Sequence, residues 1–360
     1  MTQELRLMKG NEAIAEAAIR AGVDGYFGYP ITPQSEVLEY LMAEKPHDRT
    51  GMVVLQAESE VAAINMLYGG AGCGKKVMTS SSSPGISLKQ EGISYMAGAE
   101  LPCLILNVVR GGPGLGTIQP SQSDYFQSVK GGGHGDYRLF VLAPASVQEM
   151  ADFVELGFEM AFKYRTPSLI LSDGVIGQMM EKVMLKEQKP RWTEEEIIKQ
   201  TPWATTGKTP DRPRNIITSL DLDSAKQEQH VLHLKAKYES MKQDVMFEEI
   251  GCEDAEYLLV AYGSSARICQ KAYDLARAEG IKVGIFRLIT LYPFPEEELR
   301  AYGDKVKGIL AVEMSLGQLV EDIRLAVGCR TKVEHFGRVG GMIHSPDEVV
   351  NALKNQIIGG

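Results

Sequence analysis

The sequence lacks the features of several large protein classes. Its 360 residues include five cysteines and no Cys-x-x-Cys pair, which predicts neither a disulfide framework nor an iron–sulfur cluster in this chain. No run of about 18 apolar residues occurs, so no membrane span is expected, and residues 1–9 do not resemble a signal peptide. The net charge of −9 argues against nucleic acid and anionic membranes as partners. Together these absences favour a cytoplasmic protein.

Apolar and helical segments alternate along the chain in two blocks. In the first block, short apolar runs predict strands at 25–29, 52–55, 76–80, 103–109, 138–142 and 168–172. Helices are expected between them at 61–68, 87–98 and 146–162. This alternation predicts an α/β fold with a parallel sheet and helices on both faces. We expect one such domain at 1–185, a linker and a connecting helix (223–247) at 186–254, and a smaller α/β domain at 255–360.

Two segments of the first block hold the main candidates for chemistry. Residues 29–33 read Tyr-Pro-Ile-Thr-Pro, a stiff turn whose prolines fix φ and present the Thr32 hydroxyl. Residues 58–63 place Glu58 and Glu60 where the next strand gives way to a helix. The carboxyl ends of strands form the ligand-binding edge of an open α/β sheet. The sequence therefore predicts a site there for an aromatic cofactor base and a small anion.

Arg110 follows an apolar strand and reaches the same edge. An arginine in this place either pairs with a surface acid or holds the carboxylate of a substrate by two parallel hydrogen bonds, and we favour the second role. Taken alone, Glu60 is better explained by a structural role, because an acidic residue in the first turn of a helix is favoured by the helix dipole.

The glycine-rich run at 69–76 imitates a phosphate-binding loop. Its last position is Lys76, where that loop needs serine or threonine to reach magnesium, and it follows a predicted helix instead of a strand. We therefore expect a glycine C-cap and a turn, without phosphate binding.

Four segments together resemble the alpha-type subunit of the 2-oxoacid:ferredoxin oxidoreductases. They lie at 28–33, 58–63, 110–113 (Arg-Gly-Gly-Pro) and 133–136 (Gly-His-Gly-Asp), and the chain from Tyr257 onward resembles the second domain of that subunit. The run at 114–124 is similar to the branched-chain type, which acts on 2-oxoisovalerate (3-methyl-2-oxobutanoate). The resemblance implies a thiamine-diphosphate-type pyrimidine-binding domain followed by a smaller transketolase C-terminal-like domain.

The resemblance also implies a reaction and residue roles. The reaction is oxidative decarboxylation of a 2-oxoacid with coenzyme A to acyl-CoA, carbon dioxide and reduced ferredoxin. Glu60 is expected to be catalytic, because in thiamine enzymes a glutamate hydrogen-bonds N1′ of the aminopyrimidine and promotes loss of the C2 proton; Glu58 is its competitor. Substrate binding is implied for Thr32 and Arg110. Contacts to the cofactor are implied for Pro30, Ile31 and Glu60. The role of His134 stays open.

The Gly-Asp-Gly signature that holds magnesium and diphosphate in thiamine enzymes is missing, since neither Gly135-Asp136 nor Gly303-Asp304 continues with glycine. The chain is therefore expected to supply half of a shared thiamine diphosphate site. We expect a hetero-oligomer in which a beta-type subunit carries the diphosphate and magnesium. Iron–sulfur clusters are expected in partners, with gamma- and delta-type subunits or ferredoxin among them.

Several alternatives stay open at this stage. The substrate could be 2-oxoglutarate in place of a branched-chain 2-oxoacid. The chain could belong to another thiamine enzyme, such as a transketolase-like or lipoamide-linked one. It could also be a non-catalytic scaffold subunit of a thiamine enzyme complex, although Thr32, Glu60 and Arg110 are all retained.

Overall fold

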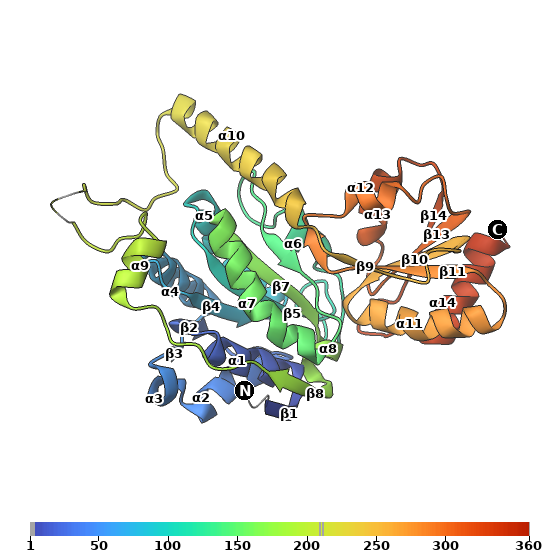
Figure 1. Ribbon diagram of the computed structural model, residues 1–360, viewed down its shortest axis with the longest axis horizontal. Helices are drawn as coiled ribbons and strands as arrows, with labels where there is room; N and C mark the ends of the chain where they lie inside the picture. Colours follow the sequence, from blue (N-terminus) through green and yellow to red (C-terminus); the bar gives the residue numbers. More distant parts are fainter. Residues whose placement is uncertain (1–3, 209, 211, 360) are drawn as a thin grey trace.

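The computed structural model describes residues 4–208, 210 and 212–359, which form two α/β units joined by a long extended segment and a helix (Figure 1). The larger unit contains a seven-stranded sheet with the strand order β12-β6-β7-β5-β4-β2-β3. Its strands are β2 (Gly25–Gly28), β3 (Val53–Gln56), β4 (Val77–Ser81), β5 (Cys103–Val109), β6 (Phe140–Leu142), β7 (Pro167–Asp173) and β12 (Thr290–Tyr292). All neighbours are parallel except β12, which runs antiparallel to β6.

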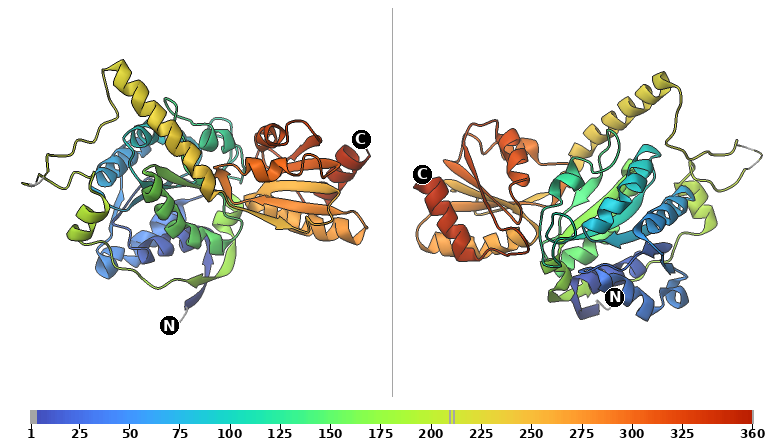
Figure 2. Two further views of the ribbon diagram at one scale, coloured as in Figure 1. Left: turned by 45° about the horizontal axis from the view of Figure 1, so that its top comes forward. Right: turned by 180° about the vertical axis from the view of Figure 1, so that it is seen from behind.

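Helices cover both faces of this sheet, as the sequence predicts. The helices α1 (Gly10–Arg20) and α7 (Val147–Tyr164) pack together on one face. The helices α4 (Glu60–Gly72) and α5 (Pro84–Gly98) pack together on the opposite face, and Figure 2 shows the two layers from different sides. The remaining elements of this unit lie along its borders: β1 (Glu4–Lys9), α2 (Ser35–Glu44), α3 (Pro46–Thr50), α6 (Tyr125–Val129), α8 (Gly174–Gln178) and β8 (Met180–Leu185).

The smaller unit has a five-stranded sheet with the order β14-β13-β10-β11-β9. Its strands are β9 (Phe247–Ile250), β10 (Tyr257–Tyr262), β11 (Val283–Leu288), β13 (Gly308–Glu313) and β14 (Lys332–Gly337), parallel except for β9. Two pairs of helices pack beside this sheet (Figure 1). They are α11 (Gly263–Ala278) with α14 (Pro346–Ala352), and α12 (Glu296–Arg300) with α13 (Leu319–Val327), and a π-helical turn (Leu353–Ile358) follows α14. The predicted two-part α/β fold is thus confirmed.

The segment that precedes the smaller sheet corrects one prediction. The connecting helix α10 (Ser224–Ser240) is followed by a short 3-10 helix (Met241–Asp244), so the expected helix does not reach residue 247. Instead Phe247 begins β9, and its ring stacks on Phe286 with 4.9 Å between the centroids. Burial against the second sheet therefore overrides the helical pattern. A further helix, α9 (Glu194–Gln200), lies earlier in this segment, and the domain boundaries themselves stay predictions.

The glycine-rich run also behaves differently from the expected turn. Its first four residues continue α4, which ends at Gly72 with Cys73 as the C-cap, and Gly74 in the turn that follows has a φ of +75°. A Cβ atom on Gly70 would lie 2.8 Å from Cγ1 of Val77, so the small residue lets the helix approach β4. Close packing of this helix on the sheet is therefore the structural reason for glycine at this point.

A buried polar seam joins the two units. The Asp173 carboxylate accepts a hydrogen bond of 2.7 Å from Ser264 Oγ, and Gln122 Nε2 donates to the Tyr262 carbonyl at 2.9 Å. Burial raises the pKa of Asp173.

Across the described residues, no helix combines the length and apolarity that crossing a bilayer requires.

The close packing of α4 and α5 leads to a stability prediction. A Cβ atom on Gly92 would lie 2.6 Å from Cγ1 of Ile64, so Gly92→Ala should lower stability by about 1–3 kcal/mol through overpacking. Gly69→Ala is the matched control, because it is also helical and has nothing within 4 Å of the added atom. Thermal unfolding should show a lower Tm for Gly92→Ala alone. Equal Tm values for the two variants would contradict the packing argument.

Candidate active site

The carboxyl ends of four adjacent parallel strands bring the predicted site residues to one edge. The strands lie in the order β5-β4-β2-β3 within the sheet. They lead into Arg110, the turn at 81–85, the turn at 29–33 and Glu60, respectively. Segments that are far apart in the sequence, such as the turn at 29–33 and Arg110, therefore meet because parallel strands end at the same side of a sheet.

Glu60 is the buried carboxylate of this edge. It is the first residue of α4, whose N-cap Ser59 accepts a hydrogen bond from the amide of Ala62 at 3.2 Å. Glu60 is 7% exposed, whereas Glu58 is exposed to solvent. The difference favours Glu60 over Glu58 for chemistry that needs a water-poor carboxylate.

The turn between β4 and α5 forms a cradle beside Glu60. A Cβ atom on Gly85 would lie 2.7 Å from Oε1 of Glu60 and 2.1 Å from Oγ of Ser81, so only glycine leaves this approach open. The hydroxyls of Ser81 and Ser82 are buried and have no hydrogen-bond partner within the described ranges. Buried polar groups without partners are uncommon and point to a ligand. A carboxylate with two hydroxyls fits a polar aromatic base such as an aminopyrimidine.

Arg110 connects two loops at this edge. Its Nη1 donates to the carbonyl of Thr32 and its Nη2 to the carbonyl of Leu115, each at 3.0 Å. Arg110 is 6% exposed, and its Nε has no partner among the residues that the structure describes. Thr32 contributes its carbonyl to this contact while the residue itself is exposed. Substrate binding by Arg110 and Thr32 stays a prediction that this arrangement allows.

Side chains from outside the turn at 29–33 donate hydrogen bonds to its backbone carbonyls. Asn11 Nδ2 and Gln178 Nε2 both donate to the Pro33 carbonyl, at 2.7 Å and 2.8 Å. Gln34 Nε2 donates to the Tyr29 carbonyl at 3.2 Å. Pro30 is exposed and Ile31 is partly exposed, so the fixed turn presents these two residues outward. Their predicted contact with a cofactor stays a prediction.

The structure adds three polar residues that the sequence reasoning did not single out. Asn107 Nδ2 donates to Asp124 at 2.9 Å, and Asn107 Oδ1 accepts from the amide of Ser83 at 3.1 Å. Burial raises the pKa of Asp124. Lys89, the third, is fully buried beneath the edge. The sequence could have indicated that Lys89 is buried, because Lys89 shares one face of a helix with Gly85 and Gly92.

An open cleft of about 590 Å³ runs between the two units beside this edge. Its walls come from three places in the chain. They are the β4–α5 turn with Ser83 and Pro84, the loop with Gly112, Pro113 and Gly114, and the second unit with Met314, Leu316 and Gln318. The cleft gives a second reactant room to reach the edge.

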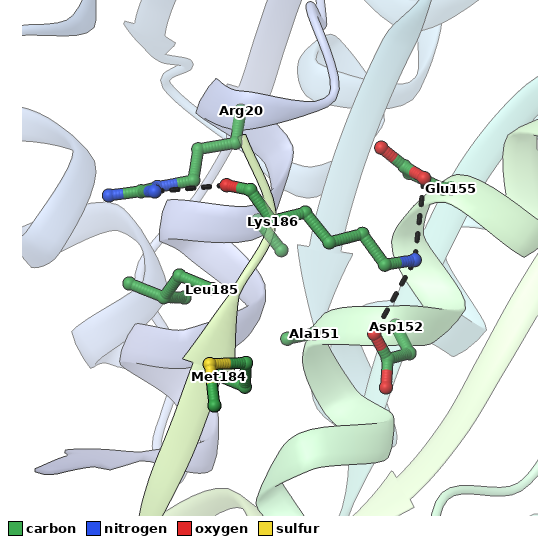
Figure 3. Close-up of a pocket in the computed structure, with 8 residues that line it drawn as sticks. Arg20, Ala151, Asp152, Glu155, Met184, Leu185 and Lys186 are labelled. Atoms are coloured by element: carbon green, nitrogen blue, oxygen red, sulfur yellow. Dashed lines mark hydrogen bonds and ion pairs between the residues drawn. The ribbon is translucent and has the colours of Figure 1, made fainter. Parts of the chain in front are cut away.

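The pocket in Figure 3 is a different place, between α1, α7 and β8. Its volume of about 10 Å³ is too small for a ligand larger than water. Lys186 Nζ lies 3.4 Å from Asp152 and 3.3 Å from Glu155, and Arg20 donates to the Lys186 carbonyl at 2.9 Å. These contacts close the crevice and give it a structural role.

Comparison with known proteins decides the family. Residues 16–248 match the family model described as pyruvate flavodoxin/ferredoxin oxidoreductase, thiamine diP-bdg. Residues 255–349 match pyruvate:ferredoxin oxidoreductase core domain II. The chain belongs to the 2-oxoacid:ferredoxin oxidoreductase family. Within it the chain is an alpha-type subunit of an oxidoreductase that works as a multi-subunit complex, and its first domain is of the thiamine-diphosphate-binding type.

The sequences of individual relatives support this family assignment. The ketoisovalerate oxidoreductase subunit VorB of Methanothermobacter marburgensis is 49% identical over 350 residues, with 97% of each chain covered. The 2-oxoglutarate synthase subunit KorA of Archaeoglobus fulgidus is 36% identical over 359 residues, with 98% of this chain and 100% of KorA covered.

Solved structures support the same fold. The 2-oxoglutarate:ferredoxin oxidoreductase from Magnetococcus marinus, with 2-oxoglutarate, coenzyme A and succinyl-CoA bound, has a TM-score of 0.85 and 28% identity. The match covers 99% of this chain and 66% of that one, so this chain spans about two thirds of its length. A split-gene transketolase has a TM-score of 0.57 at 12% identity over 98% of each chain, which shows the fold alone.

The position of Arg110 leads to a test of substrate binding. Arg110→Lys keeps the charge but loses the planar fork, so the KM for the 2-oxoacid should rise roughly 5- to 150-fold, equivalent to about 1–3 kcal/mol. Arg138→Lys is the matched control, because Arg138 also donates to two carbonyls, those of Tyr137 (2.9 Å) and Lys130 (3.3 Å), but precedes β6 at the opposite end of the sheet. Steady-state kinetics of the assembled complex give both KM values. Equal KM values in wild type and Arg110→Lys would exclude Arg110 as the carboxylate clamp.

Proposed function

We propose that this chain supplies the pyrimidine-binding half of the active site in a branched-chain 2-oxoacid:ferredoxin oxidoreductase. The reaction is oxidative decarboxylation of 2-oxoisovalerate with coenzyme A to an acyl-CoA, carbon dioxide and reduced ferredoxin. The observation that carries the proposal is the buried carboxylate of Glu60 against Gly85, on the same edge of the sheet as Arg110.

Glu60 is the proposed catalytic residue. Thiamine diphosphate, when bound, supplies the nucleophilic carbon that attacks the keto group and accepts the electrons released by decarboxylation. Glu60 would hold a proton at N1′ of the aminopyrimidine, with Ser81 and Ser82 donating to its polar edge. Pro30 and Ile31, on the fixed turn, would limit where the ring can lie. The burial of Glu60 would keep water away from the shared proton.

Arg110 and Thr32 are proposed to bind the substrate carboxylate. Arg110 lies between two loops and places a cation at the edge where the anion would arrive. Thr32 is an exposed residue on the neighbouring loop, and its hydroxyl would donate to the same group. A guanidinium and a hydroxyl thus recognise the feature that all 2-oxoacids share.

The loop after Arg110 supports a branched aliphatic substrate. Leu115 is 81% exposed and Ile118 is 57% exposed, although both are large apolar residues. Residues 111–119 contain no cation, which a second substrate carboxylate would need if it were buried. The VorB relative, named a ketoisovalerate oxidoreductase subunit, points to the same substrate class.

The exposed face of α4 and α5 is proposed to dock the beta-type subunit. Large apolar residues are open to solvent on this face beside Glu60: Val61 (45%), Met66 (39%), Leu88 (55%) and Tyr95 (41%). An exposed apolar surface of this kind marks an interaction site. The chain lacks the Gly-Asp-Gly signature that holds magnesium and diphosphate in thiamine enzymes. We therefore place magnesium and the diphosphate in this partner, and the iron–sulfur clusters in further subunits or ferredoxin.

The cleft beside Ser83 is proposed as the entry for coenzyme A. It opens at the β4–α5 turn, next to the edge that holds Glu60 and Arg110. Its volume of about 590 Å³ suits the thiol-bearing arm of a large co-substrate. The second unit would then guide the acyl acceptor toward the reacting carbon.

A substitution of Glu60 tests the catalytic assignment. Glu60→Gln keeps the shape but cannot share a proton, so turnover should fall at least about 100-fold while the complex still assembles. Glu58→Gln is the matched control and should change turnover far less, because Glu58 is exposed. The exchange rate of the C2 proton for deuterium in the bound cofactor measures the step directly. Normal exchange in Glu60→Gln together with slow exchange in Glu58→Gln would transfer the role to Glu58.

Substrate preference provides a second test. The wild-type complex should have a higher kcat/KM for 2-oxoisovalerate than for 2-oxoglutarate. Leu115→Arg adds a cation to the loop and should shift this ratio toward 2-oxoglutarate, because a second carboxylate then has a partner. Leu222→Arg, at a residue that is 89% exposed in the connecting segment, controls for the added charge. A wild-type preference for 2-oxoglutarate would refute the branched-chain assignment.

A further inference from the structure

Ser83 stands at the start of α5 without capping this helix. A serine directly before a helix usually accepts a hydrogen bond from an amide of the first turn, and a proline such as Pro84 often follows it. Ser83 occupies this N-cap position with a φ of 27° and a ψ of −82°, and its side chain makes no capping bond. A positive φ is unfavourable for a residue that has a Cβ atom. Ser83 therefore lacks the local contact that normally explains serine at this position.

The Ser83 hydroxyl instead binds the main chain of Arg110. Its Oγ accepts a hydrogen bond from the Arg110 amide at 3.1 Å and donates to the Arg110 carbonyl at 3.3 Å. The loop after Arg110 begins here, because Arg110 pairs with Pro120 in an isolated bridge and the Gly111 amide donates to the Gln119 carbonyl at 2.9 Å. Ser83 thus holds the backbone of Arg110 where the strand gives way to the loop.

Asn107 holds the backbone of Ser83 in the same place. Asn107 lies in β5 and is completely buried. Its Nδ2 donates to Asp124 at 2.9 Å, which fixes the orientation of the amide group, and its Oδ1 accepts from the Ser83 amide at 3.1 Å. The amide and the hydroxyl of Ser83 are therefore both bound to the end of β5. These bonds keep a residue with an unfavourable φ in one conformation.

Ser83 also belongs to the turn that forms the cofactor side of the site. This turn, residues 81–85, contains two buried serine hydroxyls and Gly85, which lies against the Glu60 carboxylate. On the other side of Ser83 is Arg110, the proposed partner of the substrate carboxylate. One residue therefore joins the turn beside Glu60 to the arginine that would bind the substrate.

We propose that Ser83 is a positioning residue for Arg110, whose backbone its hydroxyl fixes relative to the β4–α5 turn. The inference rests on the proposed binding of the substrate carboxylate by Arg110. Ser83 acts only through Arg110, so loss of its hydroxyl displaces the guanidinium without removing the charge. Hydrogen bonds weaken steeply when donor and acceptor are misaligned. The affinity for the 2-oxoacid therefore depends on Ser83.

Three substitutions separate the hydroxyl of Ser83 from its backbone conformation. S83A and S83G both remove the hydroxyl, so the KM for the 2-oxoacid in the assembled complex should rise roughly 2- to 12-fold in both, the loss expected for one neutral hydrogen bond. The Tm should be higher for S83G than for S83A, because glycine accepts a positive φ without strain. S83T keeps the hydroxyl, so its KM should stay within about twofold of wild type, although a β-branched residue at this φ lowers the Tm.

The comparison of the two orders decides the result. A KM that follows the Tm across these variants would overturn the proposal, because the effect would then come from stability alone. Should S83T not assemble, S83A and S83G suffice, and a wild-type KM in either would overturn the proposal. A rise confined to the KM for coenzyme A would also overturn it, because Ser83 lines the cleft and would then contact that co-substrate directly.

Ser146 offers a matched control. It is the N-cap of α7, and its hydroxyl accepts from the Glu149 amide at 3.1 Å, the capping contact that Ser83 lacks. S146A should therefore lower the Tm and leave the KM for the 2-oxoacid unchanged. An equal rise in KM for S146A and S83A would contradict the proposal, since loss of any N-cap serine would then disturb the site.

A double-mutant cycle with Arg110 separates this inference from the proposed function. S83A should raise the KM in the wild-type background and change it less than about twofold in the R110K background, because lysine has no planar fork to align. Additive effects on the KM would overturn the proposal. An unchanged KM in R110K would refute substrate binding by Arg110 and this inference with it. A raised KM in R110K with an unchanged KM in S83A would overturn this inference alone.

Discussion

The structure of the site depends on the close approach of α4 to α5 at the carboxyl edge of the sheet. Gly85 has no side chain, so the Glu60 carboxylate can lie against the first turn of α5, 2.7 Å from where a Cβ atom would be. Gly92 allows a second close contact further along α5, with the side chain of Ile64 in α4. The two contacts fix the angle and depth at which Glu60 enters the protein. A carboxylate held between helices keeps its orientation without support from a loop.

Around this contact, buried polar groups hold the loops in place. Arg110 joins the loop after β2 to the loop after β5 through two carbonyls, while Lys89 joins α5 to β4. Buried charges of this kind stabilise little on balance but are costly to separate, so they specify one arrangement of the loops. The loops that this chain contributes to the site are therefore held in one arrangement. The open side of the site is the face of α4 and α5 that exposes large apolar residues, among them Val61 and Leu88.

The sequence predicted the central strands of the larger sheet well because they are buried on both faces. Such strands appear as continuous apolar runs, and β5 was predicted with the bounds Cys103–Val109 that the structure shows. The helices were predicted less well at their ends. Residues 69–72 continue α4 where glycine suggested a turn, and Phe247 begins a strand where the charge pattern suggested a helix. In both cases packing against a sheet outweighed local preference.

Some properties of this protein followed from the sequence by itself. The alternation of strands and helices determined the α/β fold, and the stiff turn at 29–33, Glu60 and Arg110 identified the edge and the family. Only the tertiary structure decided which carboxylate is buried, since Glu58 and Glu60 are two positions apart and differ only in what covers them. It also decided that Lys89 is fully buried and donates to β4, and that Arg110 donates to the Thr32 carbonyl. The physical reason is that burial and pairing depend on elements distant in the chain, which a local pattern does not specify.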